Sequence, residues 1–229
     1  MIDNNPILVS VVIPTYNHGH FLERAIHSVI GQTYQNWEII IIDNYSTDDT
    51  DKIVNSCSDP RINFLKIHNY GVIALSRNMG IRASKGEWVA FLDSDDYWRN
   101  DKLQECINII NDKVDLIYHD LDIKNNRSGL FQRKKTKSRQ VRSPVTIDLL
   151  TRGNTIVNSS VMVRKFYLDQ IGGISESDKM IAAEDFNTWL RISQLTEYIV
   201  YLPKTLGVYL IHDEGISRKD MSLSQESAT

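Results

Sequence analysis

Apolar runs rich in β-branched residues alternate with segments of helical periodicity along the first 120 residues. The runs end at polar turns and have the length of strands that are buried on both faces. They cover residues 7–14, 37–42, 62–67, 87–92 and 115–118. The spacing and capping signals of helices occur at residues 21–30, 46–57, 73–83 and 101–111. This order predicts βαβ units and an α/β fold with a mostly parallel sheet.

After Asp120 the regular alternation stops. Short helices are predicted at residues 146–150 and 165–171, the second one ending at Gly172-Gly173 as a C-terminal cap. Residues 184–194 have the pattern of an amphipathic helix. Strands are predicted at residues 159–163, 198–202 and 207–212, and the polar residues from 217 onward predict a frayed tail.

The length of 229 residues suits one large α/β domain. Two cysteines cannot form a disulfide framework and fit a reducing compartment. The N-terminus lacks a basic stretch before an apolar core, and no apolar run reaches the roughly 20 residues of a membrane span. We therefore expect a cytoplasmic protein of one domain.

The basic residues are unevenly distributed. Eight of them, and no acidic residue, lie between Lys124 and Arg142, whereas the whole chain has a formal net charge of −3. Since the segment has little apolar periodicity, it is expected to be a solvated loop or a mobile arm. Its charge also suits peripheral contact with an anionic membrane surface, or with a lipid-linked diphosphate acceptor. Nucleic-acid binding is disfavoured because the rest of the chain is acidic.

Polar residues follow several of the predicted strands, where ligands of parallel sheets bind. Asp93-Ser94-Asp95-Asp96 places three carboxylates within four residues. Mg²⁺ and Mn²⁺ suit such a cluster because they prefer oxygen ligands. The alternative is a turn in which Asp95 and Asp96 cap the following segment.

Two further strand ends carry candidate ligands for a nucleotide. Asp43 and Asn44 can bind ribose hydroxyls or the edge of a base, while residues nearby at 46–47 suit helix capping. Thr15, Tyr16 and Asn17 offer a hydroxyl, a phenol that can stack on a base, and an amide. An exposed tyrosine in a turn is also common without any such role.

Three other residues have a functional and a purely structural interpretation. Arg77 can pair with a diphosphate or with a carboxylate such as Asp43 or Asp95, or it can be a solvated helix residue. Asp185 can act as a general base, although the helix dipole alone also favours acidic residues in a first turn. His212 suits a metal ligand or a surface imidazole.

Together these residues resemble the inverting glycosyltransferases of family 2, which have a GT-A fold, and among them the enzymes of bacterial glycan assembly. The resemblance covers about residues 7–218. The matching blocks are Val9–Asn17, Gln32–Tyr34, Trp37–Asp43, Asp48–Thr50, Ser76–Gly80, Lys85–Glu87, Phe91–Asp96, Gly172-Gly173, Glu184–Arg191, Tyr209–His212 and Gly215–Ser217. The GT-A fold implies a mixed, mostly parallel sheet. It also implies a Rossmann-like nucleotide-sugar-binding half at about 7–120, the basic loop at 121–145, an acceptor-binding half at 146–218 and a tail at 219–229.

The resemblance also implies a nucleotide sugar, most often a UDP-sugar, as the donor, and a glycan or lipid-linked glycan as the acceptor. The residues implied around the donor are Thr15, Tyr16, Asn17, Asp43, Asn44, Arg77, Asp93, Ser94 and Asp95. Asp95 and His212 would hold Mn²⁺ or Mg²⁺. Asp185 corresponds to the catalytic base, with Glu184 and Trp189 on the acceptor side. The family usually has two aspartates where this chain has Asp43-Asn44, and an asparagine can donate as well as accept a hydrogen bond.

Two other functions stay open from the sequence. A non-catalytic sugar-nucleotide-binding protein would keep the same fold, although Asp95 and Asp185 argue against it. A nucleotidyltransferase also needs a metal and a nucleotide, but it usually has a Gly-rich basic loop after the first strand, and residues 14–20 contain one glycine and no Lys or Arg. A dinucleotide-dependent oxidoreductase is disfavoured because no Gly-x-Gly-x-x-Gly follows that strand.

Overall fold

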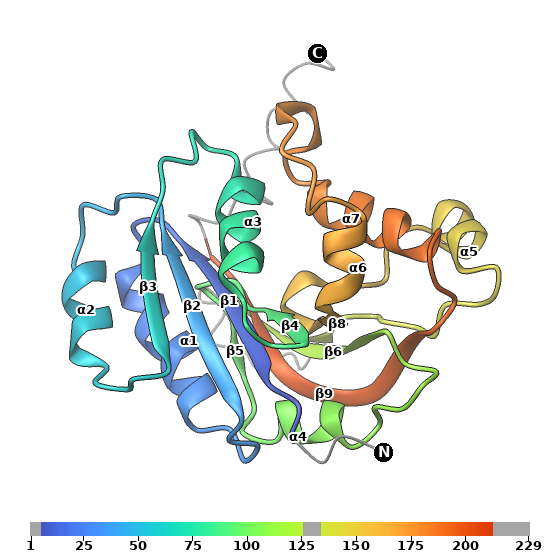
Figure 1. Ribbon diagram of the computed structural model, residues 1–229, viewed down its shortest axis with the longest axis horizontal. Helices are drawn as coiled ribbons and strands as arrows, with labels where there is room; N and C mark the ends of the chain where they lie inside the picture. The colour runs from blue at the N-terminus through green and yellow to red at the C-terminus, as the bar shows by residue number, and fades with distance from the viewer. Residues whose placement is uncertain (1–5, 126–133, 213–229) are drawn as a thin grey trace.

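The computed structural model describes residues 6–125 and 134–212, and its strands form one curved sheet (Figure 1). The strand order is β3-β2-β1-β4-β8-β6-β9-β5, with β7 paired to β6. The strands are β1 (Val9–Thr15), β2 (Trp37–Asp43), β3 (Ile62–Lys66), β4 (Trp88–Phe91), β5 (Tyr97–Trp98), β6 (Leu116–Asn125), β7 (Lys134–Lys135), β8 (Met162–Arg164) and β9 (Ile199–Ile211). The helices are α1 (Gly19–Ile30), α2 (Thr50–Ser56), α3 (Ile73–Ala83), α4 (Lys102–Ile107), α5 (Val145–Arg152), α6 (Lys165–Gln170) and α7 (Glu184–Ser193), with 3₁₀ turns η1 (Asn158–Ser160) and η2 (Asp178–Met180).

The first half of the sheet is parallel. Strand β1 pairs with β2 on one side and with β4 on the other, so that Val12 lies opposite both Ile40 and Phe91. In the second half, β8 runs antiparallel between β4 and β6, whereas β6 and β9 pair in parallel along the full length of β6. The predicted mixed, mostly parallel sheet is confirmed.

Alternate residues of β1 point to two different hydrophobic cores. Val11 packs in one core with α1 residues such as Ile26, and α2 and α4 contribute to the same core. Val12 packs in the other core, with Ile81 of α3 and Trp189 of α7. Both faces of the sheet are therefore covered by helices, which explains why its central strands are apolar throughout.

The central elements of the first half lie close to their predicted positions, and α3 has the predicted bounds. The differences lie further along the chain. Helix α4 ends four residues early, η1 replaces the first part of the strand predicted at 159–163, and the two-residue strand β5 was not predicted. The strands predicted at 198–202 and 207–212 are one strand, β9. Pro203 lies where the register between β6 and β9 shifts, so the apparent break in the sequence is an irregularity within a continuous strand.

The basic segment is more ordered than a solvated loop. Strand β6 extends to Asn125 and forms a hairpin with β7. The backbone nitrogen of Thr136 donates to the carbonyl of Leu121 at 2.9 Å, and that of Arg139 donates to the Thr155 hydroxyl at 2.9 Å. The loop prediction is therefore wrong for residues 124–125 and 134–135, which lie in β6 and β7. Residues 136–142 contain no helix or strand, as expected of a loop, but these hydrogen bonds hold this strip against its neighbours. Residues 126–133 lie outside the described residues.

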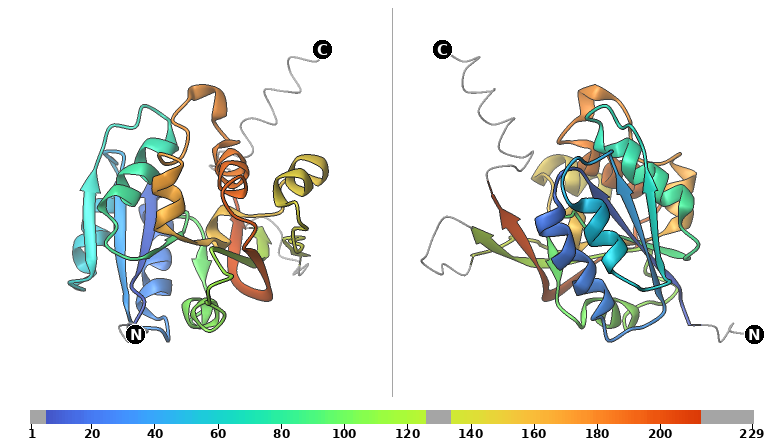
Figure 2. Two further views of the ribbon diagram at one scale, coloured as in Figure 1. Left: turned by 45° about the vertical axis from the view of Figure 1, so that its right-hand side comes forward. Right: turned by 90° about the vertical axis from the view of Figure 1, so that its left-hand side faces the viewer.

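The ends of β6 and β9 extend side by side beyond the rest of the sheet (Figure 2, right-hand view). The predicted tail and the block Gly215–Ser217 lie outside the described residues. Helix α6 ends as predicted before Gly172-Gly173, whose φ angles of 70° and 85° are of the left-handed type that caps helices. No helix in the described part of the chain has the length and apolar character needed to cross a bilayer.

Candidate functional site

A cleft of about 910 Å³ lies beyond the carboxyl ends of β1 and β4. The starts of α3 and α7 and the far ends of β6 and β9 contribute its other walls. The cleft brings together most of the site residues expected from the sequence: Thr15, Tyr16, Asn44, Arg77, Asp93, Ser94, Asp95, Glu184, Asp185 and His212. Residues from both halves of the chain thus meet in one cleft. The cleft lies beyond the carboxyl ends of parallel strands, where ligands of such sheets bind.

One corner of the cleft holds the two residues expected to bind a metal. Nε2 of His212 lies 2.8 Å from a carboxylate oxygen of Asp95, and Nδ1 of His212 is buried without a partner. Among the described residues, no three Asp, Glu, His or Cys side chains converge on one point. A carboxylate and an imidazole fit Mn²⁺ or Mg²⁺ whose remaining positions are filled by phosphate oxygens and water.

Asp96 lies beneath this corner and is buried. One of its carboxylate oxygens accepts a hydrogen bond from the backbone nitrogen of Leu210 at 3.0 Å. Burial, reinforced by the neighbouring carboxylates of Asp95 and Asp93, raises the pKa of Asp96 well above its usual range. Protonation of Asp96 removes part of the repulsion among the three carboxylates. Its hydrogen bond from Leu210 links this part of the cleft to β9.

A buried ion triad connects the two halves of the chain inside the cleft. The guanidinium of Arg77 donates to Asp93 and to Glu184, both at 2.8 Å, and Asp93 also accepts from the Asn158 amide at 3.1 Å. Arg77 therefore pairs with carboxylates of the cleft, which is one of the alternatives expected from the sequence. The two examples named there, Asp43 and Asp95, are not its partners in this structure. Helix α3 directs the guanidinium across the cleft to the start of α7, away from the end of β2.

Asp185 lies at the start of α7 and lines the cleft. Burial raises the pKa of its carboxyl to about 6, against the lowering effect of a hydrogen bond from the Phe186 backbone nitrogen. Repulsion from Glu184 also raises it, and Arg77 lowers it. A pKa near 6 leaves the carboxylate ionised at neutral pH and more basic than an exposed aspartate, as a general base requires.

Two of the expected nucleotide ligands do not line the cleft. The Asp43 carboxylate is fully buried, accepts hydrogen bonds from the backbone and hydroxyl of Ser46, and lies 3.5 Å from the ammonium of Lys66. The Asn17 side-chain oxygen accepts a hydrogen bond from the backbone nitrogen of Thr47 at 2.8 Å. Neither side chain lines the cleft in this structure, because both stabilise the turn after β2, and their contact with a nucleotide stays a prediction.

Asn44 lines the cleft beside that turn. Its side-chain oxygen accepts a hydrogen bond from the backbone nitrogen of Asn69 at 2.9 Å. Asn69 was not predicted from the sequence; it also lines the cleft, and both atoms of its amide are engaged, with the Ser76 hydroxyl and with the backbone nitrogen of Gly71. Asn44 therefore has one free polar atom at the cleft, Nδ2.

The two residues expected on the acceptor side have different positions. Glu184 lines the cleft, but one oxygen accepts from Arg77 and the other is buried without a partner. Trp189 is fully buried and packs near Phe91, with ring centroids 6.2 Å apart. The expectation that Trp189 contacts an acceptor is wrong, because the apolar side of α7 that carries it faces the core.

Several cleft residues were missed from the sequence. Many of them come from the segments at 136–138 and 154–158 and from the end of β9. These segments do not follow a parallel strand of the first half, and the prediction of site residues relied on such strand ends. The polar triplet Asn158-Ser159-Ser160, set between apolar residues, was the available signal for Asn158, the partner of Asp93. For Lys137 the available signal was its place in the basic segment between Lys124 and Arg142.

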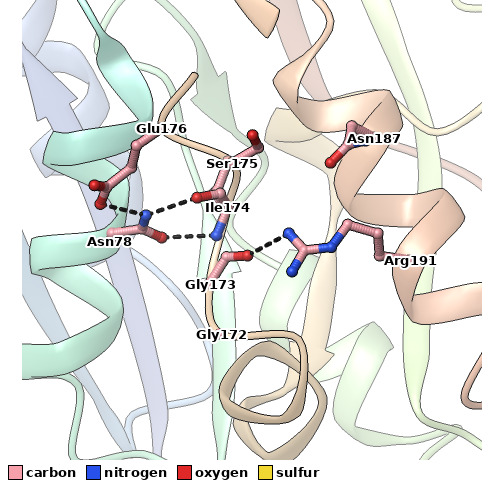
Figure 3. A pocket seen from close by; sticks show the side chains of 8 residues that line it. All are labelled: Asn78, Gly172, Gly173, Ile174, Ser175, Glu176, Asn187 and Arg191. Atoms are coloured by element: carbon pink, nitrogen blue, oxygen red, sulfur yellow. Dashed lines mark hydrogen bonds between the residues drawn. The ribbon is translucent and has the colours of Figure 1, made fainter.

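A second, polar pocket of about 400 Å³ lies between α3, α7 and the loop after α6 (Figure 3). Asn78 bridges to this loop by accepting from the Ile174 nitrogen and donating to the Ile174 carbonyl and Glu176, all at 2.8 Å. Arg191 donates to the carbonyls of Gly173 and Ile171. Most of the polar atoms are thus engaged in holding the loop against the two helices.

Comparisons with known proteins agree with this architecture. The family model described as "Glycosyl transferase family 2" matches residues 10–172. The UDP-Glc:alpha-D-GlcNAc-diphosphoundecaprenol beta-1,3-glucosyltransferase WfaP of Escherichia coli is 34% identical over 188 residues, which are 81% of this chain and 70% of WfaP. 

Two solved structures have the same fold. The crystal structure of Staphylococcus aureus TarS 1-349 in complex with UDP matches with a TM-score of 0.73 and 21% identity, covering 90% of this chain and 61% of that chain. The mannosyltransferase PcManGT from Pyrobaculum calidifontis, in complex with GDP-Man and Mn²⁺, matches with a TM-score of 0.71 and 18% identity, covering 97% and 62%. This chain therefore spans less than two thirds of each of these solved chains.

The match to the family model extends over more than half of the chain and includes β1 from its second residue, α3 and the Asp93–Asp96 cluster. The chain belongs to glycosyl transferase family 2, and it is a glycosyltransferase with the GT-A fold.

Proposed function

We propose that this protein transfers a sugar from a nucleoside diphosphate sugar, with a UDP-sugar as the favoured donor, to a hydroxyl group of a glycan or lipid-linked glycan. The anomeric configuration is inverted. The UDP bound to TarS and the donor and acceptor named for WfaP support this choice. The first half of the chain binds the donor, and the second half supplies the base and the acceptor side.

The observation that carries the proposal is the position and environment of Asp185. Its carboxylate lines the same cleft as Thr15, Asn44 and Asp95, and its pKa is raised to about 6. In the proposed reaction Asp185 accepts the proton of the acceptor hydroxyl as that oxygen forms a bond to the anomeric carbon. The bond between this carbon and the diphosphate oxygen breaks on the opposite side. Since no covalent enzyme intermediate is formed, the configuration is inverted.

The triad of Arg77, Asp93 and Glu184 positions this reaction. Arg77 neutralises two carboxylates that would otherwise surround the sugar with negative charge, and it ties the donor side of the cleft to the start of α7. Asp185 is the next residue after Glu184, so the same ion pair fixes the orientation of the base. Asp93 keeps acceptor capacity for a hydroxyl of the ribose or the sugar, because each carboxylate oxygen accepts more than one hydrogen bond.

Asp95 and His212 are the residues that would hold Mn²⁺ or Mg²⁺. A divalent cation bound there supplies a Lewis acid that neutralises negative charge on the departing diphosphate. The Mn²⁺ in the PcManGT complex supports this assignment. The chain's own contribution is to hold the carboxylate and the imidazole together, 2.8 Å apart, at the edge of the cleft.

We extend the proposal to peripheral contact with a membrane surface. Lys134 and Lys135 are exposed on β7, at the projecting end of the sheet. Each cation near an anionic surface contributes about 1 kcal/mol to binding, so such a pair gives weak attachment that salt weakens further. Sedimentation with vesicles that contain anionic lipid is expected to carry the protein down at low salt, and the double variant Lys134→Ala/Lys135→Ala less so.

The experiment that tests the proposed function is a donor screen. The protein is incubated with uridine, guanosine and thymidine diphosphate sugars, with Mn²⁺ or with a chelator, and the released nucleoside diphosphate is measured with and without a short lipid-linked acceptor. We expect release from a UDP-sugar that needs the metal, is lost in Asp95→Ala, and rises when the acceptor is added.

Asp185→Asn distinguishes catalysis from binding. This variant is expected to bind UDP with unchanged affinity and to lose transfer, because the amide cannot accept the proton. Preserved transfer in Asp185→Asn would refute the assigned base. Binding of UDP without turnover of any donor would instead support a non-catalytic protein of the same fold.

A further inference from the structure

Lys137 is a cleft residue that the family comparison does not assign. It lies in the segment after β7, and its neighbours are fixed by the main chain: Thr136 pairs with Leu121 on β6, and the Ser138 nitrogen donates to the Asp120 carboxylate at 3.3 Å. The segment therefore holds the Cα of Lys137 at the cleft wall, while the side chain itself is exposed.

The charges around the cleft leave Lys137 without a counterion. Among the described residues that line the cleft, Arg77 and Lys137 are the lysines and arginines. Arg77 is already bound to two carboxylates. Lys137 makes no ion pair or hydrogen bond within the described residues, so its ammonium is available to a ligand.

A hydroxyl next to Lys137 also lacks a partner. Ser138 lines the cleft, and its hydroxyl is buried without a hydrogen-bond partner. A buried hydroxyl without a partner is unfavourable unless a water or a ligand satisfies it. An ammonium and a hydroxyl on adjacent residues are donors that suit phosphate oxygens.

We propose that Lys137 binds a phosphate group in the cleft, assisted by the Ser138 hydroxyl. The inference rests on the proposed function, in which two ligands carry diphosphates: the nucleotide donor and a lipid-linked acceptor. Either diphosphate offers phosphate oxygens that the Lys137 ammonium can bind. Lys137 is thus a positioning residue that acts by attracting and orienting a substrate anion.

The test uses Lys137→Ala, the charge-preserving variant Lys137→Arg, and Lys135→Ala as a matched control in the same strip but outside the cleft lining. Vesicle-free assays keep membrane contact out of the comparison. The affinity for UDP is measured by calorimetry. The KM is measured for two acceptors that share one sugar, one with a diphosphate-linked short lipid and one with a simple alkyl group.

In Lys137→Ala we expect a loss of about tenfold for the phosphate-bearing ligand that Lys137 contacts. A weaker Kd for UDP identifies the donor diphosphate. A higher KM for the diphosphate acceptor, with the alkyl acceptor unchanged, identifies the acceptor. Lys137→Arg restores most of the loss, and Lys135→Ala behaves as the unmodified protein.

Unchanged UDP affinity together with unchanged KM for both acceptors in Lys137→Ala overturns the inference but leaves the proposed function intact. An equal rise in KM for both acceptors also overturns it, because the loss would then not depend on phosphate. Failure of the unmodified protein to bind UDP or to use either acceptor overturns the proposed function as well.

Discussion

The side-chain oxygen of Asn44 accepts a hydrogen bond from the backbone nitrogen of Asn69, 2.9 Å away. This bond fixes the orientation of the amide, since a flipped side chain would leave a buried backbone donor facing another donor. Nδ2 has no partner within the described residues. At this position the cleft therefore presents a hydrogen-bond donor.

Asn44→Asp is expected to reverse that polarity. One carboxylate oxygen still accepts from Asn69, and the other offers an acceptor to the N3–H of uracil, a group that cytosine lacks. The ratio of UDP to CDP affinity is expected to rise about tenfold relative to the unmodified protein. Calorimetric titrations of both proteins with both nucleotides measure it. An unchanged ratio, with UDP still bound, would place the base away from Asn44.

The pH dependence of transfer follows from Asp185. Burial raises the pKa of its carboxyl to about 6, and only the ionised form accepts a proton from the acceptor. The value of kcat/KM is expected to rise about tenfold per pH unit below pH 6 and to level off above it. Profiles measured between pH 4.5 and 8 test this, with protein stability followed at the same pH values. An activity that is level down to pH 4.5 would assign the base to another group.

Asp185→Asn is also expected to be more stable than the unmodified protein at neutral pH. Because the folded-state pKa lies above that of an unfolded aspartate, the folded chain binds the proton more tightly, and stability falls as pH rises from about 4 to about 6. Asp185→Asn has no ionisable group at this position, so its stability does not fall over this pH range for this reason. With a discount for the partly exposed carboxyl, the gain is about 1–2 kcal/mol at pH 7, or roughly 2–8 °C in Tm. A gain of equal size at pH 4 and pH 7 would contradict the electrostatic cause.

Arg77 is expected to be required for folding as well as for positioning. Arg77→Met leaves the carboxylates of Asp93 and Glu184 without their cation in a largely buried site. Loss of one partner of such a group costs about 3–5 kcal/mol, which chemical denaturation measures. The double variant Arg77→Met/Glu184→Gln is expected to recover part of this loss, because it removes one unpaired charge. No recovery would show that Arg77 stabilises the fold by packing alone.

Much of the fold and part of the site were predictable from the sequence. Buried parallel strands such as β2 have continuous apolar runs, and polar residues past their ends, such as Asp95, fall at one edge by geometry. These signals are local. The partners of Arg77 were not identified from the sequence because Glu184 is 107 residues away in the chain, and the pairing depends on how α7 packs against the first half.

These differences have the same physical origin. The resemblance places Trp189 on the acceptor side, but α7 directs its side chain into the core. Asp43 was assigned to the nucleotide because it ends a strand, but the turn after β2 uses its carboxylate. In both cases the residue type and the element were predicted correctly, and the direction of the side chain was decided by neighbours that are distant in sequence.

Lys102 is a buried lysine outside the cleft. The Lys102 side chain is fully buried, its ammonium lies 3.9 Å from the centroid of the Trp98 ring, and Nζ has no hydrogen-bond partner. Burial lowers the pKa of Lys102 to about 8 and, with the Lys102 charge, lowers the pKa of His119 to about 3. Below pH 8 the folded protein therefore contains a charged group that burial disfavours.

Lys102→Met is expected to stabilise the protein at pH 7 by about 1–3 kcal/mol, because methionine has a similar length and makes favourable contacts with aromatic rings. Between pH 8 and about 10.5 the unfolded lysine holds its proton more tightly than the folded one, so the stability of the unmodified protein rises and the difference shrinks. Urea denaturation at pH 7 and pH 9.5 measures both values, with the exposed Lys113→Met as the control. Destabilisation by Lys102→Met at both pH values would show that the ammonium makes a favourable interaction in the core, against the expectation from its burial.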